Sequence, residues 1–273
     1  MYNLLFGDCL EKLSLLEENS VSLIMTSPPY GKRRSKDYGG VDPDRYVEWW
    51  LTLEPELRRV LKEDGTLILN IKENVVDCQR HTYVLEIILA MKEKGWLWTE
   101  EWCWHKKNSV PGKWPNRFRD SWERCLQFNL NKKFQMFQDE VKVPIGDWAT
   151  GRLKKLSEND KKRMQSKSGS GTGKNVSNWV GRDTVYPTNV LHLATQCSNV
   201  GHSAAYPENL PRFFIKLFSK KGDLILDPFL GSGTTGVVAT QLNRGFVGIE
   251  IEEKYYKLAQ ERIKIATKTQ ENK

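Results

Sequence analysis

Apolar and polar positions along the chain follow two different periods, and the changes of period mark the predicted elements. Short apolar runs predict strands at residues 2–6, 21–25, 66–71, 96–105, 122–129, 223–226 and 245–250. Apolar residues at helical spacing predict helices at residues 9–16, 45–61, 82–93, 212–218, 237–242 and 254–266. Because strands and helices alternate, we predict an α/β fold with a Rossmann-like, mostly parallel sheet and helices on both faces.

The regular pattern is lost between residues 131 and 184. Between Arg152 and Arg182 there are nine Lys or Arg against two acids, and residues 166–174 read SKSGSGTGK, a linker composition. We interpret 131–184 as an inserted, partly flexible segment, and 1–130 and 185–273 as two halves of one domain. The alternative is a solvated surface loop without a special role.

Composition narrows the class of protein. The 273 residues carry a net charge of +8, which favours an anionic partner such as DNA. The five Cys include no C-x-x-C, and the four His show no paired ligand spacing, so we expect neither a disulfide framework nor a metal site. Without an apolar run of about eighteen residues or a signal sequence, we expect a cytoplasmic protein.

A glycine-rich turn follows the strand predicted at residues 223–226. It reads DPFLGSGTTG, and its glycines Gly231, Gly233 and Gly236 match the G-x-G-x-x-G pattern of nucleotide-binding turns. Glu250 ends the next strand, where a carboxylate can accept hydrogen bonds from ribose hydroxyls. An acid before the turn, Asp227, would repel a pyrophosphate but suits the cationic, amine-bearing end of S-adenosylmethionine.

A second motif, Ser27-Pro28-Pro29-Tyr30, stands at the end of the strand predicted at residues 21–25. An exocyclic amine on a base is a poor nucleophile, and acceptors on its two N–H bonds would assist its attack on a methyl group. The Ser27 hydroxyl and the Pro28 carbonyl are candidate acceptors. Tyr30 offers a flat face for a base turned out of the duplex. A Pro-rich turn with a buried Tyr is the alternative.

Together the two motifs resemble those of the amino-methyltransferase family of DNA modification enzymes. TSPPY at 26–30 resembles the catalytic motif, and DPFLGSGTT at 227–235 resembles the cofactor motif. This order is that of the family's β group, so the resemblance implies a circularly permuted class I methyltransferase fold with an inserted target-recognition region. LLFGD at 4–8, GFVGIE at 245–250, HSAAYPENL at 202–210 and the segment Trp104, Lys106, Asn108 and Pro111 also resemble family segments, although Ser203 replaces a usual Pro.

The resemblance implies S-adenosylmethionine as the cofactor and assigns residues to the site. Ser27, Pro28, Pro29 and Tyr30 would be catalytic. Cofactor-binding residues would be Asp8, Asp227, Pro228, Phe229, Gly231, Ser232, Gly233, Thr234, Thr235 and Glu250. The topology would also bring the final helix, 254–266, beside the first strand, so that the two ends of the chain complete one site.

In this family Ser before Pro-Pro usually goes with cytosine N4, and Asp or Asn with adenine N6, so we expect N4 of cytosine, with N6 of adenine as the alternative. Double-stranded DNA is the expected partner, and a cognate restriction endonuclease the genetic partner; the resemblance allows a monomer or a homodimer. Candidate DNA-binding residues are Lys32, Arg33, Arg34, Arg152, Lys154, Lys155, Lys161, Lys162, Arg163, Lys174 and Arg182.

Three other functions are consistent with parts of the sequence. A methyltransferase of RNA or of protein glutamine uses related Pro-Pro-Tyr turns, typically with Asn first and the cofactor motif upstream. A dinucleotide-dependent oxidoreductase would explain the glycines but leaves Ser27–Tyr30 without a role. A catalytically silent DNA-binding module would retain the cofactor without turnover.

Overall fold

The computed structural model describes residues 2–31, 40–109, 112, 115–146, 151, 153–157, 180–195 and 206–271. The chain divides into two compact units, of which the first joins residues 1–137 to residues 189–273 and the second comprises residues 138–188. In the second unit, a 3-10 turn, η2 (Gln138–Val141), precedes a two-stranded antiparallel ladder of β8 (Val143–Pro144) and β9 (Thr184–Val185).

The first unit is built on an eight-stranded sheet with the order β1-β12-β11-β2-β3-β7-β6-β10. All neighbours pair in parallel except β7, which is antiparallel to both β3 and β6. The strands are β1 (Tyr2–Phe6), β2 (Val21–Thr26), β3 (Leu61–Ile71), β6 (Leu97–Lys106), β7 (Trp122–Asn129), β10 (Val190–Leu193), β11 (Leu224–Asp227) and β12 (Gly245–Glu250). The predicted mostly parallel sheet is therefore confirmed.

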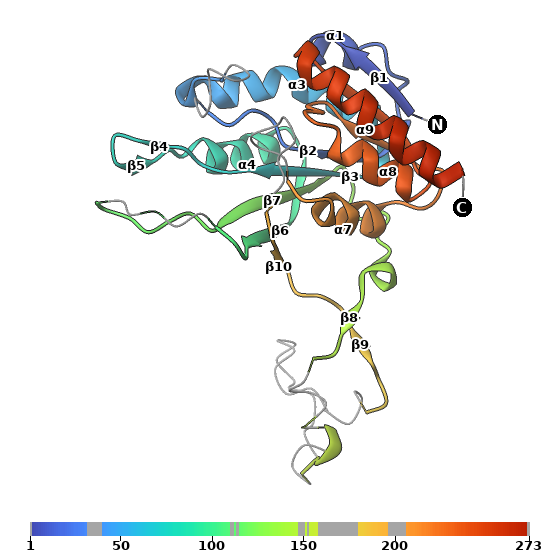
Figure 1. Ribbon diagram of the computed structural model, residues 1–273. Helices are drawn as coiled ribbons and strands as arrows, with labels where there is room; N and C mark the ends of the chain where they lie inside the picture. The colour runs from blue at the N-terminus through green and yellow to red at the C-terminus, as the bar shows by residue number, and fades with distance from the viewer. Residues whose placement is uncertain are drawn as a thin grey trace. The chain divides into compact units, whose positions relative to one another are not determined.

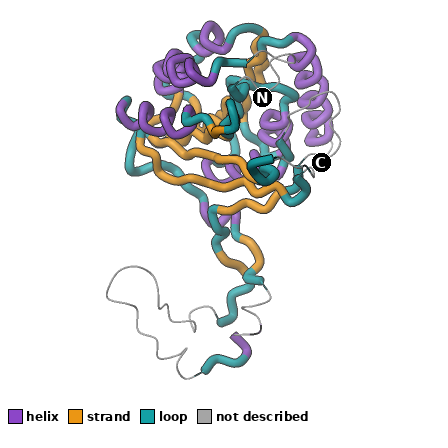
Figure 2. The backbone as a smooth tube through the Cα atoms, turned by 90° about the vertical axis from the view of Figure 1, so that its left-hand side faces the viewer, coloured by secondary structure: helices purple, strands orange, loops and turns teal. Residues whose placement is uncertain are grey.

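Helices cover both faces of this sheet (Figure 2). α1 (Cys9–Leu13), η1 (Pro43–Arg45), α3 (Tyr46–Val60) and α4 (Tyr83–Glu93) belong to one side, and α7 (Asn209–Phe218), α8 (Thr234–Gln241) and α9 (Glu253–Glu271) to the other. Successive side chains of a strand point to opposite faces of the sheet. Val247 of β12 and Leu226 of β11 pack with α3 and α4, whereas Phe246 of β12 lies beside α8 and α9. A small hairpin of β4 (Val75–Val76) and β5 (Gln79–Arg80) follows β3.

The two ends of the first unit meet in the sheet. Tyr2 pairs with Phe246 and Phe6 with Glu250, while the Tyr256 hydroxyl of α9 donates a hydrogen bond to the Leu4 carbonyl at 3.1 Å. Figure 1 shows β1 in blue beside the red α9. The expected meeting of the last helix with the first strand is thus confirmed.

Several predicted bounds were wrong. The helix expected at residues 9–16 ends at Leu13. Among the apolar residues at helical spacing in this segment, only Leu13 is buried, and Leu10 is 39% exposed. β3 begins at Leu61 rather than residue 66, since Leu61 pairs with Val21 of β2. α8 begins at Thr234 rather than residue 237, directly after Gly233 in the left-handed region.

Among the described residues, no helix is both long enough and apolar enough to cross a membrane.

Candidate active site

The two motifs lie side by side at the carboxyl ends of parallel strands. β2 ends at Thr26 and runs into Ser27–Tyr30, and its neighbour β11 ends at Asp227. The Thr26 hydroxyl donates a hydrogen bond to Asp227 Oδ1 at 2.8 Å. Ligand sites of open α/β sheets lie at this edge, so the fold brings together segments that are 201 residues apart in sequence.

Asp227 is the most enclosed carboxylate of the site, with 1% of its surface exposed. Besides Thr26, it accepts hydrogen bonds from the Thr235 hydroxyl at 2.6 Å, the Tyr206 hydroxyl at 3.3 Å and the Phe229 backbone N–H at 3.2 Å. Burial raises the pKa of Asp227, and the hydrogen bonds only partly offset this effect. The carboxylate therefore holds β2, β11 and the start of α8 together.

The glycine turn has the backbone conformation that its sequence predicts. Gly231 has φ 53° and Gly233 has φ 80°, both in the left-handed region that favours glycine. A Cβ on Gly233 would lie 2.8 Å from the Ala259 Cβ of α9, so the residue also permits close packing. The turn leads into α8, whose N-cap Gly233 makes no side-chain hydrogen bond, so no capping side chain satisfies the first N–H groups of the helix.

The hydroxyls of the turn are directed into the protein. Thr235 bonds to Asp227, while Ser232 and Thr234 both accept from Arg262 of α9, at 3.0 and 3.2 Å. Arg262 also donates to the Ser232 carbonyl at 2.6 Å, and burial lowers its pKa. These predicted cofactor-binding residues can therefore offer a ligand their backbone N–H groups rather than their hydroxyls.

Two further acids stand at the ends of the neighbouring strands. Glu250, at the end of β12, accepts from the Gly231 N–H at 2.7 Å and from the Glu252 N–H at 2.9 Å, and burial raises its pKa. Asp8, two residues after the end of β1, caps α1 by accepting from the Leu10 N–H at 2.9 Å. Since Phe6 pairs with Glu250, both carboxylates lie at the same sheet edge as Asp227.

The Ser-Pro-Pro-Tyr loop is fixed from the side of α3. The buried Tyr46 donates its hydroxyl proton to the Pro29 carbonyl at 2.7 Å, which occupies one of the two acceptor positions of that oxygen. Within the described residues, the Pro28 carbonyl accepts no such hydrogen bond. Of the two proline carbonyls, that of Pro28 therefore has the greater capacity to accept a hydrogen bond from a ligand.

Tyr30 is held by a polar network that involves β3, β6 and β7. Its hydroxyl donates to Glu123 Oε2 at 2.7 Å, lies 3.5 Å from Asn70 Oδ1, and accepts a long hydrogen bond of 3.4 Å from Ser27. Glu123 also accepts from Asn70 Nδ2 at 3.3 Å and forms an ion pair with Lys106. Burial and the charge of Glu123 raise the pKa of Tyr30, so its phenol stays protonated and donates.

Most of the predicted DNA-binding residues lie outside the described residues. Lys154, Lys155 and Arg182 are described, and all three are exposed in the second unit. The following lie outside: Lys32, Arg33, Arg34, Arg152, Lys161, Lys162, Arg163 and Lys174.

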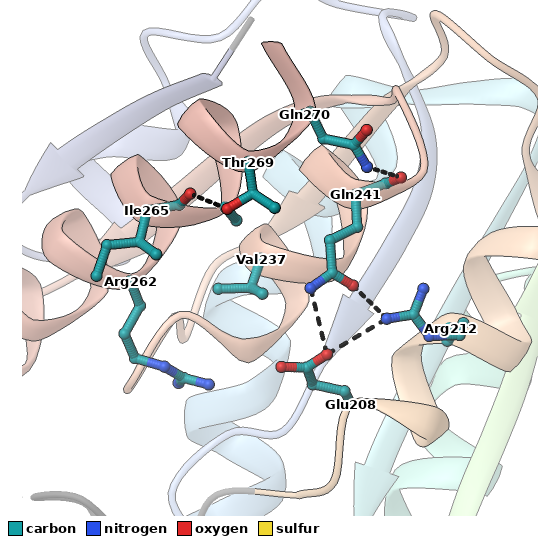
Figure 3. Close-up of a pocket in the computed structure, with 9 residues that line it drawn as sticks. Glu208, Arg212, Val237, Gln241, Arg262, Ile265, Thr269 and Gln270 are labelled. Atoms are coloured by element: carbon teal, nitrogen blue, oxygen red, sulfur yellow. Dashed lines mark hydrogen bonds and ion pairs between the residues drawn. The ribbon is translucent and has the colours of Figure 1, made fainter. Parts of the chain in front are cut away.

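A pocket of about 460 Å³ lies among α7, α8 and α9 and does not coincide with the predicted site. Its lining includes a hydrogen-bonded network of Glu208, Arg212 and Gln241, and Arg262 lies alongside (Figure 3). None of the predicted catalytic or cofactor-binding residues lines it. Arg262 nevertheless connects this pocket to the glycine turn, since its guanidinium contacts Ser232.

Sequence reasoning missed four side chains that organise the site: Thr26, Asn70, Glu123 and Arg262. Thr26 belongs to the TSPPY motif, but the motif alone does not indicate its contact with Asp227. Glu123 had a weak signal, since residues 123, 127 and 129 place polar side chains on one face of a strand. Asn70 and Arg262 had none, because their contacts come from distant segments.

Residues 21–261 match the sequence profile of the DNA methylase family (N6_N4_Mtase). Type II methyltransferase M.PvuII of Proteus hauseri is 30% identical, with 91% of this chain and 80% of that protein covered. M.SmaI of Serratia marcescens is 27% identical, with 95% of this chain and 90% of that protein covered.

Solved structures have the same fold. A PvuII DNA methyltransferase described as cytosine-N4-specific superposes with a TM-score of 0.73 at 24% identity, over 96% of this chain and 86% of that one. The M1.HpyAVI–SAM complex superposes with a TM-score of 0.60 at 20% identity, over 96% of this chain and 100% of that one. The predicted permuted class I methyltransferase fold is thereby confirmed.

Proposed function

The chain belongs to the DNA methylase family, and on that premise we propose that it transfers a methyl group from S-adenosylmethionine to N4 of a cytosine in DNA. It is a DNA amino-methyltransferase of the restriction-modification type. The choice of base and the roles of individual residues are the parts that we propose.

One observation carries the proposal: the hydrogen bond between Thr26 and Asp227. It joins the residue before Ser27 to the first residue of the cofactor motif, so that a methyl donor beside Asp227 and an amine beside Ser27 would be neighbours. Methyl transfer requires this proximity, because holding both reactants in place removes the entropic cost of their encounter.

The residues at the strand ends fit S-adenosylmethionine. Glu250 uses one hydrogen bond per carboxylate oxygen and keeps acceptor capacity for ribose hydroxyls. Asp227 already has two donors on each oxygen, so it would attract the cofactor's ammonium through its charge. Gly231 and Gly233 let the turn approach closely. When bound, the cofactor supplies a methyl group activated by a positively charged sulfur.

On the other side of the site, the chain would hold the base. The Ser27 hydroxyl and the Pro28 carbonyl accept hydrogen bonds from the amine and stabilise the positive charge that develops on its nitrogen. Tyr30 presents its ring to a base turned out of the duplex, and Glu123 fixes that ring through the phenol. Residues 131–184, with their excess of Lys and Arg, would contact the DNA around the target.

Two observations support cytosine over adenine. Ser27, rather than Asp or Asn, precedes the two prolines. A solved structure that superposes over 96% of this chain is that of a cytosine-N4-specific enzyme. Adenine N6 is the alternative, since the family includes methylases of both amino groups.

The test is methylation of unmodified genomic DNA with labelled S-adenosylmethionine, followed by digestion to nucleosides and mass spectrometry. We expect N4-methylcytosine, and a Ser27→Ala variant should bind the cofactor but give much less product. Detection of N6-methyladenine instead would reject the choice of base and keep the reaction. Cofactor binding without any methylated base in DNA would reject DNA as the substrate.

A further inference from the structure

Phe118 is the most exposed of the large apolar side chains that the structure describes. Its exposed fraction is 94%, against 70% for Leu15, the next highest. It lies in the connection between β6 and β7, within the run Pro-Asn-Arg-Phe-Arg-Asp-Ser of residues 115–121. An aromatic ring that gains nothing from the folded core is available to a partner.

The β6–β7 connection is placed at the edge of the sheet where the active site lies. β7 is antiparallel to both β3 and β6, so the connection leaves β6 at the carboxyl edge of the sheet. Glu123, which binds the Tyr30 hydroxyl, is only five residues beyond Phe118. A fully extended chain of that length spans at most about 18 Å. Figure 1 shows the connection and the β4–β5 hairpin extending from the same side of the sheet.

The backbone beside Phe118 is anchored although its ring is not. Asp120 pairs with Arg80 at 2.8 Å, with the buried Lys72 at 3.3 Å and with Arg117 at 3.4 Å. The next residue, Ser121, accepts from the Lys106 N–H at 2.7 Å. Although burial opposes ionisation of Asp120, these cations hold its pKa below the usual value. These contacts hold in place the backbone that carries the Phe118 ring.

The charges around the ring match a nucleic acid. Arg117 and Arg119 flank Phe118, Lys107 is exposed at the start of the same connection, and Arg80 is 47% exposed. Guanidinium groups bind phosphate oxygens well, and an apolar side chain between them is the arrangement by which proteins insert wedges into DNA. A purely apolar groove on another protein would not match these flanking cations.

We propose that Phe118 enters the DNA duplex and fills the space left by the target base when that base turns out toward Tyr30, while the exposed Arg119 holds an adjacent phosphate. This inference rests on the proposed function. Flipping a base costs its stacking and pairing, and a ring that takes its place recovers part of the stacking.

The experiment first needs the sequence that the enzyme methylates. The wild-type protein is incubated with unmodified plasmid DNA, the modified positions are read by sequencing, and a short duplex with that sequence is synthesised. If the wild-type protein methylates no DNA, the proposed function fails at this step. The role of Phe118 is examined in the next step, so the two failures are distinguished.

Phe118→Ala and Phe118→Trp are then compared on two duplexes: the matched one, and one whose target base faces an abasic site. On the matched duplex, Phe118→Ala should lower kcat/KM by about 10- to 100-fold, whereas Phe118→Trp should retain most of it. Opposite the abasic site, where no pairing has to be broken, the Ala variant should come within about threefold of the wild type. Leu89→Ala, which removes a side chain that is 60% exposed on α4, serves as the control and should match the wild type on both.

Two results would overturn the proposal. Full activity of Phe118→Ala on the matched duplex would show that the ring does not enter the DNA and would leave it for a protein partner. An equal loss on both duplexes would show a role unrelated to base extrusion. Because Phe118 is exposed, the variant should melt at the wild-type temperature, and a melting curve that shows this excludes misfolding as the cause of an equal loss.

Discussion

Glu123 is a buried carboxylate, with an exposed fraction of only 7%. Its partners are Lys106, Asn70 and the Tyr30 hydroxyl. A buried ion pair contributes little to stability on balance, since desolvation offsets the attraction between the charges. The ion pair between Glu123 and Lys106 is therefore better explained by its role in orienting Tyr30 than by a contribution to stability.

Glu123→Gln should reduce kcat by about tenfold or more while changing the affinity for S-adenosylmethionine little. The substitution preserves size, but it leaves the Lys106 ammonium without its anion and weakens the hold on Tyr30. Steady-state kinetics and calorimetry with the cofactor would measure the two effects. In a double-mutant cycle with Tyr30→Phe, the losses should be less than additive. Strictly additive losses would mean that Glu123 acts independently of Tyr30.

The raised pKa values of Asp227 and Glu250 give cofactor binding a pH dependence. In the free protein, burial favours the protonated carboxyl groups, whereas a bound ammonium and ribose favour the ionised ones. Affinity for S-adenosylmethionine should therefore weaken as pH falls through the raised pKa values, by about tenfold for each unit of pKa change on binding. Calorimetry between pH 8 and 5 would measure this change in affinity, because a carboxyl group with the ordinary pKa of about 4 stays ionised over that range.

Glu250→Gln is the control for this dependence, because it cannot ionise. Its cofactor affinity should be lower at pH 8 and change less with pH. The stability of the cofactor-free protein should respond oppositely: the folded state binds more protons than the unfolded state, so these groups destabilise it increasingly as pH rises through their folded pKa values. A cofactor affinity that is independent of pH would remove both carboxylates from the binding site.

At the scale of elements, the glycine turn and α9 depend on each other. Gly233 has φ 80° and no room for a Cβ beside Ala259, whereas Gly222, at φ 86°, has open space around it. Both positions favour glycine for the backbone, but only Gly233 needs it for packing as well. Gly222 therefore serves as the control for Gly233, because it has the same backbone constraint without the packing constraint.

Gly222→Ala should cost about 1–2 kcal/mol through backbone strain alone. Gly233→Ala should cost about 1–3 kcal/mol more, because the methyl group would push α9 away from the turn. Denaturant unfolding would measure both, and only Gly233→Ala should weaken binding of S-adenosylmethionine. Equal costs at the two sites, with cofactor affinity unchanged, would contradict the close packing of turn and helix.

The sequence predicted the elements that carry the motifs better than the contacts among them. The apolar run at residues 245–250 and the pattern at 2–6 gave the observed bounds of β12 and β1, since each is a short run that ends at a glycine or an acid. Residues 61–65 contain a turn-like Asp-Gly pair, yet they extend β3, because pairing of Leu61 with Val21 outweighs local preference.

The polar residues of β7 show why the sequence indicated the network around Tyr30 only weakly. Glu123, Gln127 and Asn129 lie on one face of the strand and Leu126 and Phe128 on the other, a pattern that ordinarily indicates a polar face turned to water. In the structure these residues are buried, at 7%, 1% and 0% exposed. Periodicity identifies a face of a strand, but it does not say whether water or a polar network covers that face.

At the scale of the whole molecule, the division into two units predicts a separation of tasks. The proposed cofactor-binding and catalytic residues belong to the first unit, whereas Lys154, Lys155 and Arg182 belong to the second. A variant with residues 138–188 replaced by a Gly/Ser linker should melt cooperatively and bind S-adenosylmethionine with an affinity close to that of the full chain.

The same variant should lose sequence-specific methylation of DNA, and its residual DNA binding should depend less steeply on salt, because phosphate contacts are removed. Melting curves, calorimetry and binding at two salt concentrations would measure these three properties. Failure to bind the cofactor would show that the first unit depends on the second. Retained sequence specificity would move target recognition out of residues 138–188.

The pairing of β1 with β12 also has a consequence for the making of the protein. The ribosome completes β1 first and reaches its partner only after roughly 240 further residues, which takes on the order of 10 to 50 s at about 5–20 residues per second. β11, the glycine turn and β12 are made only in the last part of that time. A nascent chain can therefore display the Ser-Pro-Pro-Tyr loop without a means of modifying DNA, and a message cut short before codon 227 yields no active product.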